Sequence, residues 1–594
     1  MISSIIDRNK LKKITFFTKR NMRRILHIYF KRRKIMHRFF SVILILTLYA
    51  NQAISETDID SFAVRVNQLF QHYHNDTTPG VAVLVQHKGE ILYLRCFGSA
   101  NLEHNIPITP QTSFDLASVS KHITAFAILM LERQGKLDIN ENIRSYLNEL
   151  PQFADSIRIK DLIYQSSGLW EFWTILNKYS GFRNRDYFNM NDVLTLIQYQ
   201  EELLFPPGTR YAYTNTNYSL LAEIVKRITG QSFEKWTREN IFNPLGMFET
   251  FFQENCSLPI SQKASAYRKR NGKIVLARPA NVEIPGSAHA FTTLNDMAVW
   301  LNNFRTKKVG GPEIFQKMIT KGRLRNGEEI DYGAGCIVSE FMGDTIIQHS
   351  GQSGGYKAMM IYHPKETLGV VILANERSID VYDLAHEILE IFFKTDKKQE
   401  LAATQPKRSQ FINLPRSKLN IYCGGYQIEN SGDLLGVYIN YDLLVGSILG
   451  LGSEYFYPLT ENTFSDYGRN TFIRFIFAED STVVGASVVL RGDTLYAAKI
   501  RPTLAWQKTE NNISGFYYCI SLGSCCRIEK RNNETILSHR RYSDIQLFEL
   551  TLNQFVGQWG FIEFTQDTGG LVDGFVLKDE LFGFKEIRFI KISN

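Results

Sequence analysis

Cysteine is scarce in this chain, which has seven among 594 residues. The cysteines are scattered, and they show neither the regular spacing of a disulfide framework nor the paired Cys-x-x-Cys with nearby His that zinc sites need. The one cluster, Cys519 with Cys525 and Cys526, is expected to pack or to form one local disulfide after export. The sequence therefore predicts no metal site and no cofactor.

A long apolar run is also missing at the N-terminus, where the stretch 39–50 is too short to span a bilayer comfortably. It follows a basic run at 31–38 and precedes Ala53 and Ser55, which fit the small-x-small pattern of a signal-peptidase site. We expect a signal peptide at about 36–55 and export to the periplasm or beyond. The alternatives are an uncleaved membrane anchor and, more weakly, a mitochondrial-type presequence.

A net positive charge is absent from the body of the protein, although the whole chain carries a net charge of +8. Residues 1–55 hold thirteen Lys and Arg and one Asp, which leaves 55 basic against 59 acidic residues in the remainder. A basic balance confined to a leader says nothing about the partner of the folded body. We therefore expect no nucleic-acid partner, and membrane contact only through an uncleaved leader.

The first long segment, 56–396, has the pattern of an α+β domain. Apolar alternation predicts a hairpin over 80–97, and helical spacing predicts a buried helix over 118–133. Further helices are expected at 191–200, 219–229, 232–240, 294–304 and 381–394, and strands at 344–348, 358–362 and 368–374. Strands at both ends of the segment predict an antiparallel sheet in which these ends meet, flanked by helices with a helical subdomain.

The C-terminal part has a different texture. Residues 397–413 are polar and read as a linker, and short Val, Ile, Phe and Tyr runs between turn residues then predict barrel-like all-β domains at 414–508 and 509–594. Asn462-x-Phe464 and Phe477 with Asp480 are echoed about 90 residues later by Asn553-x-Phe555 and Phe564 with Asp567. This weak repeat favours one barrel per copy.

Ser118-Val119-Ser120-Lys121 opens the predicted buried helix. A spacing of three residues puts the hydroxyl and the amine on one helix face, and burial lowers the pKa of a lysine so that it can take the proton of a serine. The pattern alone is weak, because Ser232-x-x-Lys235 has the same spacing. There Ser232 follows Gly230 and reads as a helix cap with a solvated lysine.

Two further segments carry candidate polar groups. In Tyr213-Thr214-Asn215 the phenol, its pKa lowered by a neighbouring ammonium, can act as a general base, and the amide can hold a substrate carbonyl. The plain alternative is that Tyr213 packs and Asn215 caps a turn. His349-Ser350-Gly351-Gln352 ends a predicted strand, where glycine lets a substrate backbone approach closely.

A rival nucleophile lies in Gly351-Gln352-Ser353-Gly354-Gly355, which satisfies the Gly-x-Ser-x-Gly elbow of α/β-hydrolases. Asp380 and His386 follow in the expected order. An elbow needs a helix after its serine, however, and 356–362 reads as a strand.

The order Ser118-x-x-Lys121, Tyr213-x-Asn215, His349-x-Gly351 resembles the motif set of the class C β-lactamase and penicillin-binding-protein superfamily. The likeness covers about 60–395. It includes phrases between the motifs, namely Thr78-Pro79-Gly80, Ser166-Ser167-Gly168-Leu169, Thr229-Gly230-Gln231-Ser232, Asn243-Pro244-Leu245-Gly246-Met247 and Asp296-Met297-Ala298-x-Trp300. The remainder is similar, more loosely, to the lipocalin-like domains appended to D-aminopeptidase-type and esterase-type members.

The resemblance implies that Ser118 is the nucleophile, Lys121 and Tyr213 a proton-transfer pair, and Asn215 a substrate contact. It also implies an oxyanion hole made by the N–H groups of Ser118 and Gln352. The substrate implied is a small molecule or a short peptide: a D-amino-acid peptide or amide, or a small ester.

Two residues depart from the family pattern. His349 stands where many β-lactamases have the lysine of Lys-Thr-Gly, which favours the aminopeptidase and esterase branches, and Gln165 stands where relatives often have His. With an ordinary pKa of about 6.5, His349 would bind a substrate carboxylate less well as pH rises. β-Lactam or peptidoglycan hydrolysis remains an alternative, and so does a non-catalytic peptidoglycan- or partner-binding protein.

Overall fold

The computed structural model describes residues 61–593 with internal gaps. These gaps are 74–76, 181–185, 271, 278–280, 397–410, 413, 430, 432, 441–442, 449–451, 467–470, 491–492, 501–512, 533, 540–541, 552 and 580–583. The predicted leader and most of the predicted linker therefore lie outside the described residues.

The chain divides into two compact units. The smaller one takes in the described residues 61–71 and the end of helix α11 (Val381–Asp396). In it the rings of Phe62 and Phe392 meet edge to face, with centroids 6.2 Å apart. The larger unit holds the α+β domain and the C-terminal barrels.

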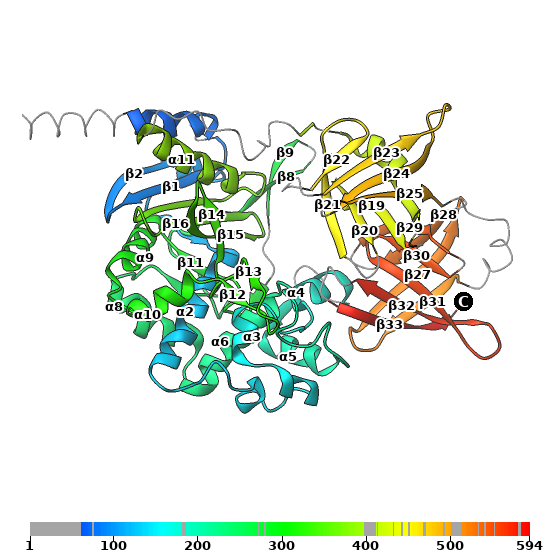
Figure 1. The fold of residues 1–594 in the computed structure, drawn as a ribbon, viewed down its shortest axis with the longest axis horizontal. Coiled ribbons are helices and arrows are strands. Elements are labelled where there is room, and N and C mark those ends of the chain that lie inside the picture. Colours follow the sequence, from blue (N-terminus) through cyan, green and yellow to red (C-terminus); the bar gives the residue numbers. More distant parts are fainter. Residues whose placement is uncertain are drawn as a thin grey trace, which may run out of the picture. The chain divides into compact units, whose positions relative to one another are not determined.

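An antiparallel six-stranded sheet organises the α+β domain (Figure 1). Its order is β14 (Ile337–Phe341), β15 (Asp344–Ser353), β16 (Tyr356–His363), β17 (Leu368–Ala374), β1 (Val81–His87) and β2 (Glu90–Phe97). β1 pairs with β17, with Val81 opposite Ala374, so the two ends of the domain meet as predicted. Lys88 and Gly89, at φ 52° and 92°, form the tight turn of the predicted hairpin.

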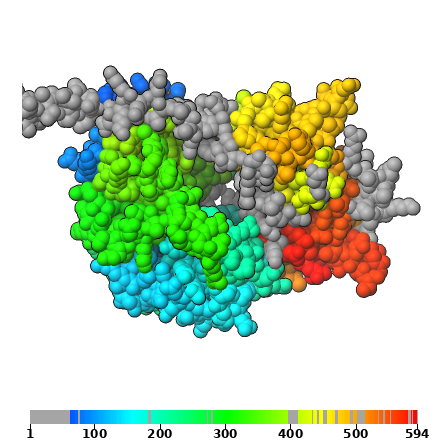
Figure 2. All heavy atoms as spheres, viewed as in Figure 1, coloured from blue at the N-terminus to red at the C-terminus, as the bar shows by residue number. Residues whose placement is uncertain are grey.

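The helices form the second part of the domain. The main ones are α2 (Ser120–Arg133), α3 (Ile159–Ile163), α5 (Met190–Gln198), α6 (Asn215–Thr229), α7 (Phe233–Thr237), α9 (Leu294–Thr306) and α10 (Pro312–Met318). Figure 1 shows α3, α5 and α6 gathered on one side of the sheet, and Figure 2 shows their cyan residues forming one side of the domain surface and green residues the other. Helix α2 is central and almost wholly buried, as its apolar sequence predicts.

Short elements connect these parts. They are α4 (Phe172–Thr174), α8 (Asn243–Leu245), β3 (Ser99–Asn101), β4 (Ile106–Pro107), β5 (Phe114–Asp115), β6 (Tyr187–Asn189), β7 (Phe251–Phe252), β8 (Tyr267–Arg270), β9 (Lys273–Leu276), β10 (Asn281–Glu283), β11 (Ala290–Thr292), β12 (Gly322–Arg323) and β13 (Glu329–Ile330).

Two predicted helices differ from the observed ones. Helix α6 begins at Asn215 rather than at 219, because Thr214 caps it, and α7 passes into a π-helical turn after Thr237.

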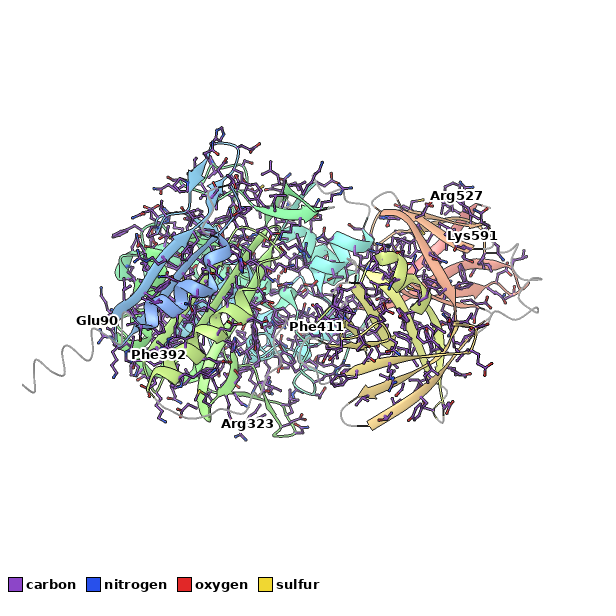
Figure 3. The ribbon with its side chains drawn as sticks, turned by 90° about the horizontal axis from the view of Figure 1, so that it is seen from above. Glu90, Arg323, Phe392, Phe411, Arg527 and Lys591 are labelled. Carbon is purple, nitrogen blue, oxygen red and sulfur yellow. The ribbon has the colours of Figure 1, made fainter. Side chains whose placement is uncertain are left out.

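After the short helix α12 (Arg416–Leu419), the C-terminal part folds into two closed eight-stranded barrels. The first comprises β18 (Gly424–Ile428), β19 (Leu434–Asn440), β20 (Leu443–Ile448), β21 (Gly452–Pro458), β22 (Thr463–Ser465), β23 (Phe472–Phe477), β24 (Val483–Leu490) and β25 (Asp493–Lys499). The second comprises β26 (Gly515–Cys519), β27 (Ser524–Arg531), β28 (Glu534–His539), β29 (Tyr542–Glu549), β30 (Gln554–Gly557), β31 (Gly560–Gln566), β32 (Val572–Asp579) and β33 (Phe584–Ser593). Figure 3 shows Arg527 of β27 and Lys591 of β33 on the outside of the second barrel.

The two barrels repeat the same internal contacts. In the first, the Phe475 amide donates to the Asn462 carbonyl and the ring of Phe475 meets Phe464 edge to face. In the second, Phe564 makes the same pair of contacts with Asn553 and Phe555. The predicted repeat is therefore present, but the counterpart of Phe564 is Phe475 and not Phe477, because the two copies differ by two residues in the connection before this strand.

Within the larger unit, the second barrel contacts the segment that follows Trp170. The Tyr179 hydroxyl donates to the Trp559 carbonyl at 2.9 Å, and the Tyr179 ring packs edge-on against Phe584, with centroids 4.9 Å apart. These contacts fix the second barrel to the part of the α+β domain that contains Tyr179.

The thiols of all seven cysteines are free, and Cys519 and Cys526 are packed inside the second barrel rather than bridged. Among the described residues, no helix has the length and apolar character needed to cross a bilayer.

Candidate active site

The candidate nucleophile stands at a tight turn between strand β5 and helix α2. Asp115 ends β5, and a 3₁₀ turn over Ala117–Val119 leads into the helix. Ala117 has a φ of 47°, a left-handed conformation that costs a non-glycine residue free energy unless its surroundings hold it. The turn leaves Ser118 partly exposed while Lys121, one helical turn on, is fully buried.

Lys121 has three hydrogen-bond partners. Its Nζ lies 3.1 Å from Ser118 Oγ, 2.7 Å from Asn215 Oδ1 and 2.8 Å from the Ser287 carbonyl oxygen. Burial lowers the pKa of Lys121 to about 7, while the nearby Glu171 carboxylate acts in the opposite direction. The amine is therefore neutral in a large fraction of molecules at neutral pH.

A neutral amine fits this arrangement atom by atom. Its two N–H groups donate to the Asn215 and Ser287 oxygens, which are both acceptors in this geometry. The lone pair then points to the remaining neighbour, the Ser118 hydroxyl. The geometry sets Lys121 to accept the serine proton, which is what activation of this nucleophile requires.

Tyr213 and Asn215 lie on either side of Thr214, the N-cap of α6. The Thr214 side chain accepts from the Thr216 amide and caps the helix. Glu171 orients the candidate amide, because its Oε1 accepts from Asn215 Nδ2 at 2.9 Å. Asn215 Oδ1 is thereby turned toward Lys121. The alternative in which Asn215 only caps a turn does not describe this contact.

The Tyr213 hydroxyl reaches the nucleophile. The phenol interacts with the Ser118 side chain, and the Tyr213 ring centroid lies 4.8 Å from Lys121 Nζ. Part of the Tyr213 ring is exposed, but loss of water around the phenol oxygen raises the pKa of Tyr213 well above the ordinary value, and Ser118 only partly opposes this. The predicted lowering of this pKa is therefore wrong, because the loss of water around the phenol is the largest influence on it. Tyr213 is a protonated donor.

His349 also differs from the prediction. Burial, and next the Lys121 amine, lower the pKa of His349 to about 3. Its Nδ1–H donates to the Ser350 carbonyl at 2.7 Å, which leaves Nε2 as an acceptor 3.5 Å from the Tyr332 hydroxyl. The proposed loss of a cationic contact on raising pH is therefore wrong, because the ring is neutral throughout the physiological range.

Gly351 and Gln352 bring strand β15 against the nucleophile turn. A Cβ on Gly351 would lie 2.2 Å from the Leu116 carbonyl oxygen and 3.1 Å from the Ser118 nitrogen. Glycine is thus required here by the turn itself, and the predicted approach of a substrate backbone stays a prediction. Ser353 and Tyr356 close the β15–β16 hairpin, so the Gln352 amide points away from β16, to the strand edge.

Ser353 is not a nucleophile elbow. It ends strand β15, and β16 begins at Tyr356 in antiparallel pairing. A nucleophile elbow places its serine between a strand and a helix, so the α/β-hydrolase alternative is wrong.

Gln165 holds the backbone on both sides of Tyr213. Its carbonyl accepts from the Ala212 amide at 2.8 Å, and its side-chain Oε1 accepts from the Thr214 amide at 3.1 Å. The same Oε1 accepts from Asn217 Nδ2 at 2.6 Å. Gln165 is fully buried and has a φ of 56°. Gln165, which departs from the family pattern, therefore positions the phenol of Tyr213.

We expect Gln165→Leu to lower kcat/KM about a hundredfold, because it leaves the Thr214 amide unpaired and displaces Tyr213 by a fraction of an ångström. Gln165→His, which keeps an acceptor and tolerates positive φ, should lose less. Gln231→Leu is the matched control, since its amide bonds only the exposed Glu239. Equal activity of Gln165→Leu and wild type, at equal folded fraction, would contradict this role.

A second prediction concerns pH. The kcat/KM is expected to rise with pH through a midpoint near 7 and then level off, because Lys121 accepts a proton only when it is neutral. Glu171→Gln should move the midpoint to lower pH, since the carboxylate raises the pKa of Lys121. A pH–rate profile with its rising limb near 10, the region of an ordinary lysine, would rule out the buried amine as base.

Two groups at the site were not among the candidates from the sequence, namely the Glu171 side chain and the Ser287 carbonyl. Glu171 lies two residues after the Ser166-Ser167-Gly168-Leu169 phrase, and that phrase is the signal that could have found it. The Ser287 carbonyl is a backbone group and has no sequence signature. Among the described residues, no three His, Cys, Asp or Glu side chains gather closely enough to hold a metal ion.

Comparison with known proteins places this site in context. The beta-lactamase family model matches residues 66–391. A D-aminopeptidase of Gluconobacter oxydans (strain 621H) is 28% identical over 305 residues, which are 50% of this chain and 56% of that protein. Protein flp of Staphylococcus aureus (strain MRSA252) is 26% identical over 314 residues, 50% of this chain and 60% of that protein. The chain thus spans a little over half the length of these relatives.

Two solved structures are also similar to this chain. A penicillin-binding protein from Bacillus halodurans is 24% identical, with a TM-score of 0.48 over 55% of this chain and 99% of that one. The octameric penicillin-binding protein homologue from Pyrococcus abyssi is 21% identical, with a TM-score of 0.49 over 74% of this chain and 99% of that one.

Proposed function

The chain belongs to the beta-lactamase family, and on that premise we propose that it hydrolyses an amide or an ester through an acyl-enzyme on Ser118. One observation carries the proposal. The buried Lys121 amine has acceptors for both of its N–H groups and lies 3.1 Å from the Ser118 hydroxyl, so its lone pair is directed at the proton to be removed.

In the proposed acylation, a proton passes from Ser118 to Lys121 and another from Tyr213 to the leaving group. Lys121 takes the Ser118 proton as Oγ attacks the substrate carbonyl carbon, and the carbonyl electrons move onto its oxygen. The Ser118 and Gln352 amides stabilise that oxyanion. When the bond to the leaving group breaks, Tyr213, a protonated phenol, gives it a proton and recovers one from the Lys121 ammonium. Water then attacks the acyl-enzyme carbonyl carbon, and its proton passes to Lys121. When the bond between Oγ and the acyl group breaks, the Lys121 ammonium returns this proton to Ser118 Oγ and the carboxylic acid product leaves.

The electrostatics of the site favour a substrate without a carboxylate beside the scissile bond. Many β-lactamases hold such a carboxylate with a lysine at the position of His349, which here is neutral. A D-amino-acid amide or short peptide, or a small ester, is the class we propose, and the similarity to a D-aminopeptidase supports it. β-Lactams and peptidoglycan peptides ending in a carboxylate are the second candidates.

A panel of three substrate types tests the choice. D-Alanine p-nitroanilide, p-nitrophenyl acetate and a chromogenic cephalosporin are to be compared by kcat/KM on the mature protein. We expect turnover of the amide or the ester to exceed that of the cephalosporin. Preference for the cephalosporin would overturn the substrate class but not the mechanism. Absence of any Ser118 adduct would favour a non-catalytic binding protein.

Export is part of the proposal. It is supported by the basic run, the apolar stretch and the small-residue cleavage pattern of residues 31–55. N-terminal sequencing of protein secreted by a bacterial host tests it. We expect the mature chain to begin at Glu56, whereas a chain that retains its leader in the membrane fraction would favour the anchored alternative.

A further inference from the structure

A buried carboxylate lies behind the nucleophile turn and has no part in the proton transfers described above. Asp115 is almost fully buried at the end of strand β5. Its Oδ1 accepts from the Ala117 amide at 2.7 Å, and its Oδ2 lies 3.1 Å from His289 Nδ1. The Ser353 side chain lies near the same carboxylate and helps to lower its pKa.

These three partners come from three separate parts of the site. Ala117 directly precedes Ser118, whose amide forms one half of the proposed oxyanion hole. Ser353 directly follows Gln352, whose amide forms the other half. His289 lies two residues after Ser287, whose carbonyl accepts from Lys121. One carboxylate therefore connects the neighbours of both oxyanion donors and of a lysine acceptor.

The strand geometry explains how Ser353 reaches Asp115. Side chains alternate along a strand, so Gly351 and Ser353 project from the same face of β15. That face is the one against the nucleophile turn, because the missing Cβ of Gly351 would meet the Leu116 carbonyl oxygen and the Ser118 nitrogen. The close approach permitted by Gly351 brings the Ser353 hydroxyl to the carboxylate.

The strained backbone around the nucleophile turn also needs stabilising contacts. Ala117 and His289 both have positive φ, 47° and 66°, which costs a non-glycine residue free energy. Both are bonded to Asp115. Burial alone would raise the pKa of Asp115, but the His289 ring, the Ala117 amide and the Ser353 hydroxyl together hold it below its usual range. The carboxylate is thus ionised and can hold all three partners.

We propose that Asp115 is a positioning residue that fixes the two halves of the oxyanion hole relative to each other through Ala117 and Ser353. This inference rests on the proposed Ser118 chemistry. It also assigns a role to Ser353, which does not stand in a nucleophile elbow.

The test compares Ser353→Ala, Asp115→Ala and the double variant with wild type. We measure kcat and KM for p-nitrophenyl acetate, and the Kd of phenylboronic acid, which forms a tetrahedral adduct on the nucleophilic serine. Loss of one oxyanion donor typically lowers kcat by about 10²- to 10³-fold. We expect Asp115→Ala to approach the lower figure and Ser353→Ala to lose about tenfold. The boronate Kd should rise by the same factors, with KM within about twofold of wild type.

Coupling is the decisive outcome. If Ser353 acts through Asp115, the double variant should match Asp115→Ala, whereas independent effects would multiply. Asp115→Asn, which keeps an oxygen for the Ala117 amide, should restore most of the activity. Ser156→Ala, on an exposed turn, is the matched control for loss of a hydroxyl.

Two results would overturn the proposal. One is a folded Ser353→Ala protein with unchanged kcat and boronate affinity, which is informative even if Asp115→Ala does not fold. The other is multiplication of the two losses in the double variant. Neither result touches the proposed function, which fails only if wild-type protein lacks Ser118-dependent turnover.

Discussion

Ser118→Ala is expected to lower kcat on p-nitrophenyl acetate or a D-amino-acid amide by up to about 10⁶-fold, a loss of the order seen when the nucleophile of a serine protease is removed. The reason is chemical. Without Oγ no acyl-enzyme forms, and what remains is the contribution of substrate binding and the oxyanion donors. The measurement is single-turnover release of p-nitrophenol or p-nitroaniline at saturating enzyme, which detects a residual rate that steady-state assays miss.

The chain contains its own control for this change. Ser232 has the same Ser-x-x-Lys spacing, but its side chain accepts from the Lys235 amide as the cap of helix α7, and Lys235 is exposed. Ser232→Ala should therefore cost about 1 kcal/mol of stability and leave kcat unchanged. Retention of activity by Ser118→Ala, with or without loss in Ser232→Ala, would refute the mechanism.

Lys121→Met is expected to lower kcat/KM by about 10²- to 10⁴-fold, the usual contribution of a positioned general base. Methionine nearly matches the buried lysine in length, so the change removes the lone pair with little change in volume. It also leaves Asn215 Oδ1 and the Ser287 carbonyl without a donor, which adds to the loss. Stopped-flow measurement of the acylation burst separates this step from deacylation.

The pH–rate profile of Lys121→Met is a further test of the role of this lysine. The rising limb near pH 7 should disappear in Lys121→Met, since no other group at the nucleophile has a pKa near neutrality: Tyr213 lies well above and His349 near 3. Lys235→Met, the matched lysine of α7, should keep both the rate and the limb. A limb that survives in Lys121→Met would assign the base to another group.

The α+β fold could be predicted from the sequence because its signals are local. Apolar alternation marks β1 and β2, and a buried helical period marks α2. The first residue of a helix such as α6 could not be predicted, because several residues near it can serve as an N-cap as Thr214 does. Strand β15 extends five residues beyond the predicted 344–348, since its end pairs only with β16 and its glycine is required by a contact distant in sequence.

The candidate site was predictable only in part. Ser118 and Lys121 share a helix face through spacing alone, whereas their approach to Tyr213 and Asn215 could be inferred only from resemblance to a family. Lys121 is held by a side chain 94 and a carbonyl 166 residues away. The direction of the pKa changes at Tyr213 and His349 depends on burial, which a sequence does not give.

The most direct test of the account is the site of covalent labelling by a fluorophosphonate. Mature wild-type protein, Ser118→Ala and Ser353→Ala are treated with the reagent, and the modified peptide is identified by mass spectrometry. We predict one adduct, on Ser118, in wild type and in Ser353→Ala, and none in Ser118→Ala. An adduct on Ser353 or another serine, or wild-type protein that turns over substrate while Ser118 stays unlabelled, would contradict the central claim that Lys121 and Tyr213 activate Ser118.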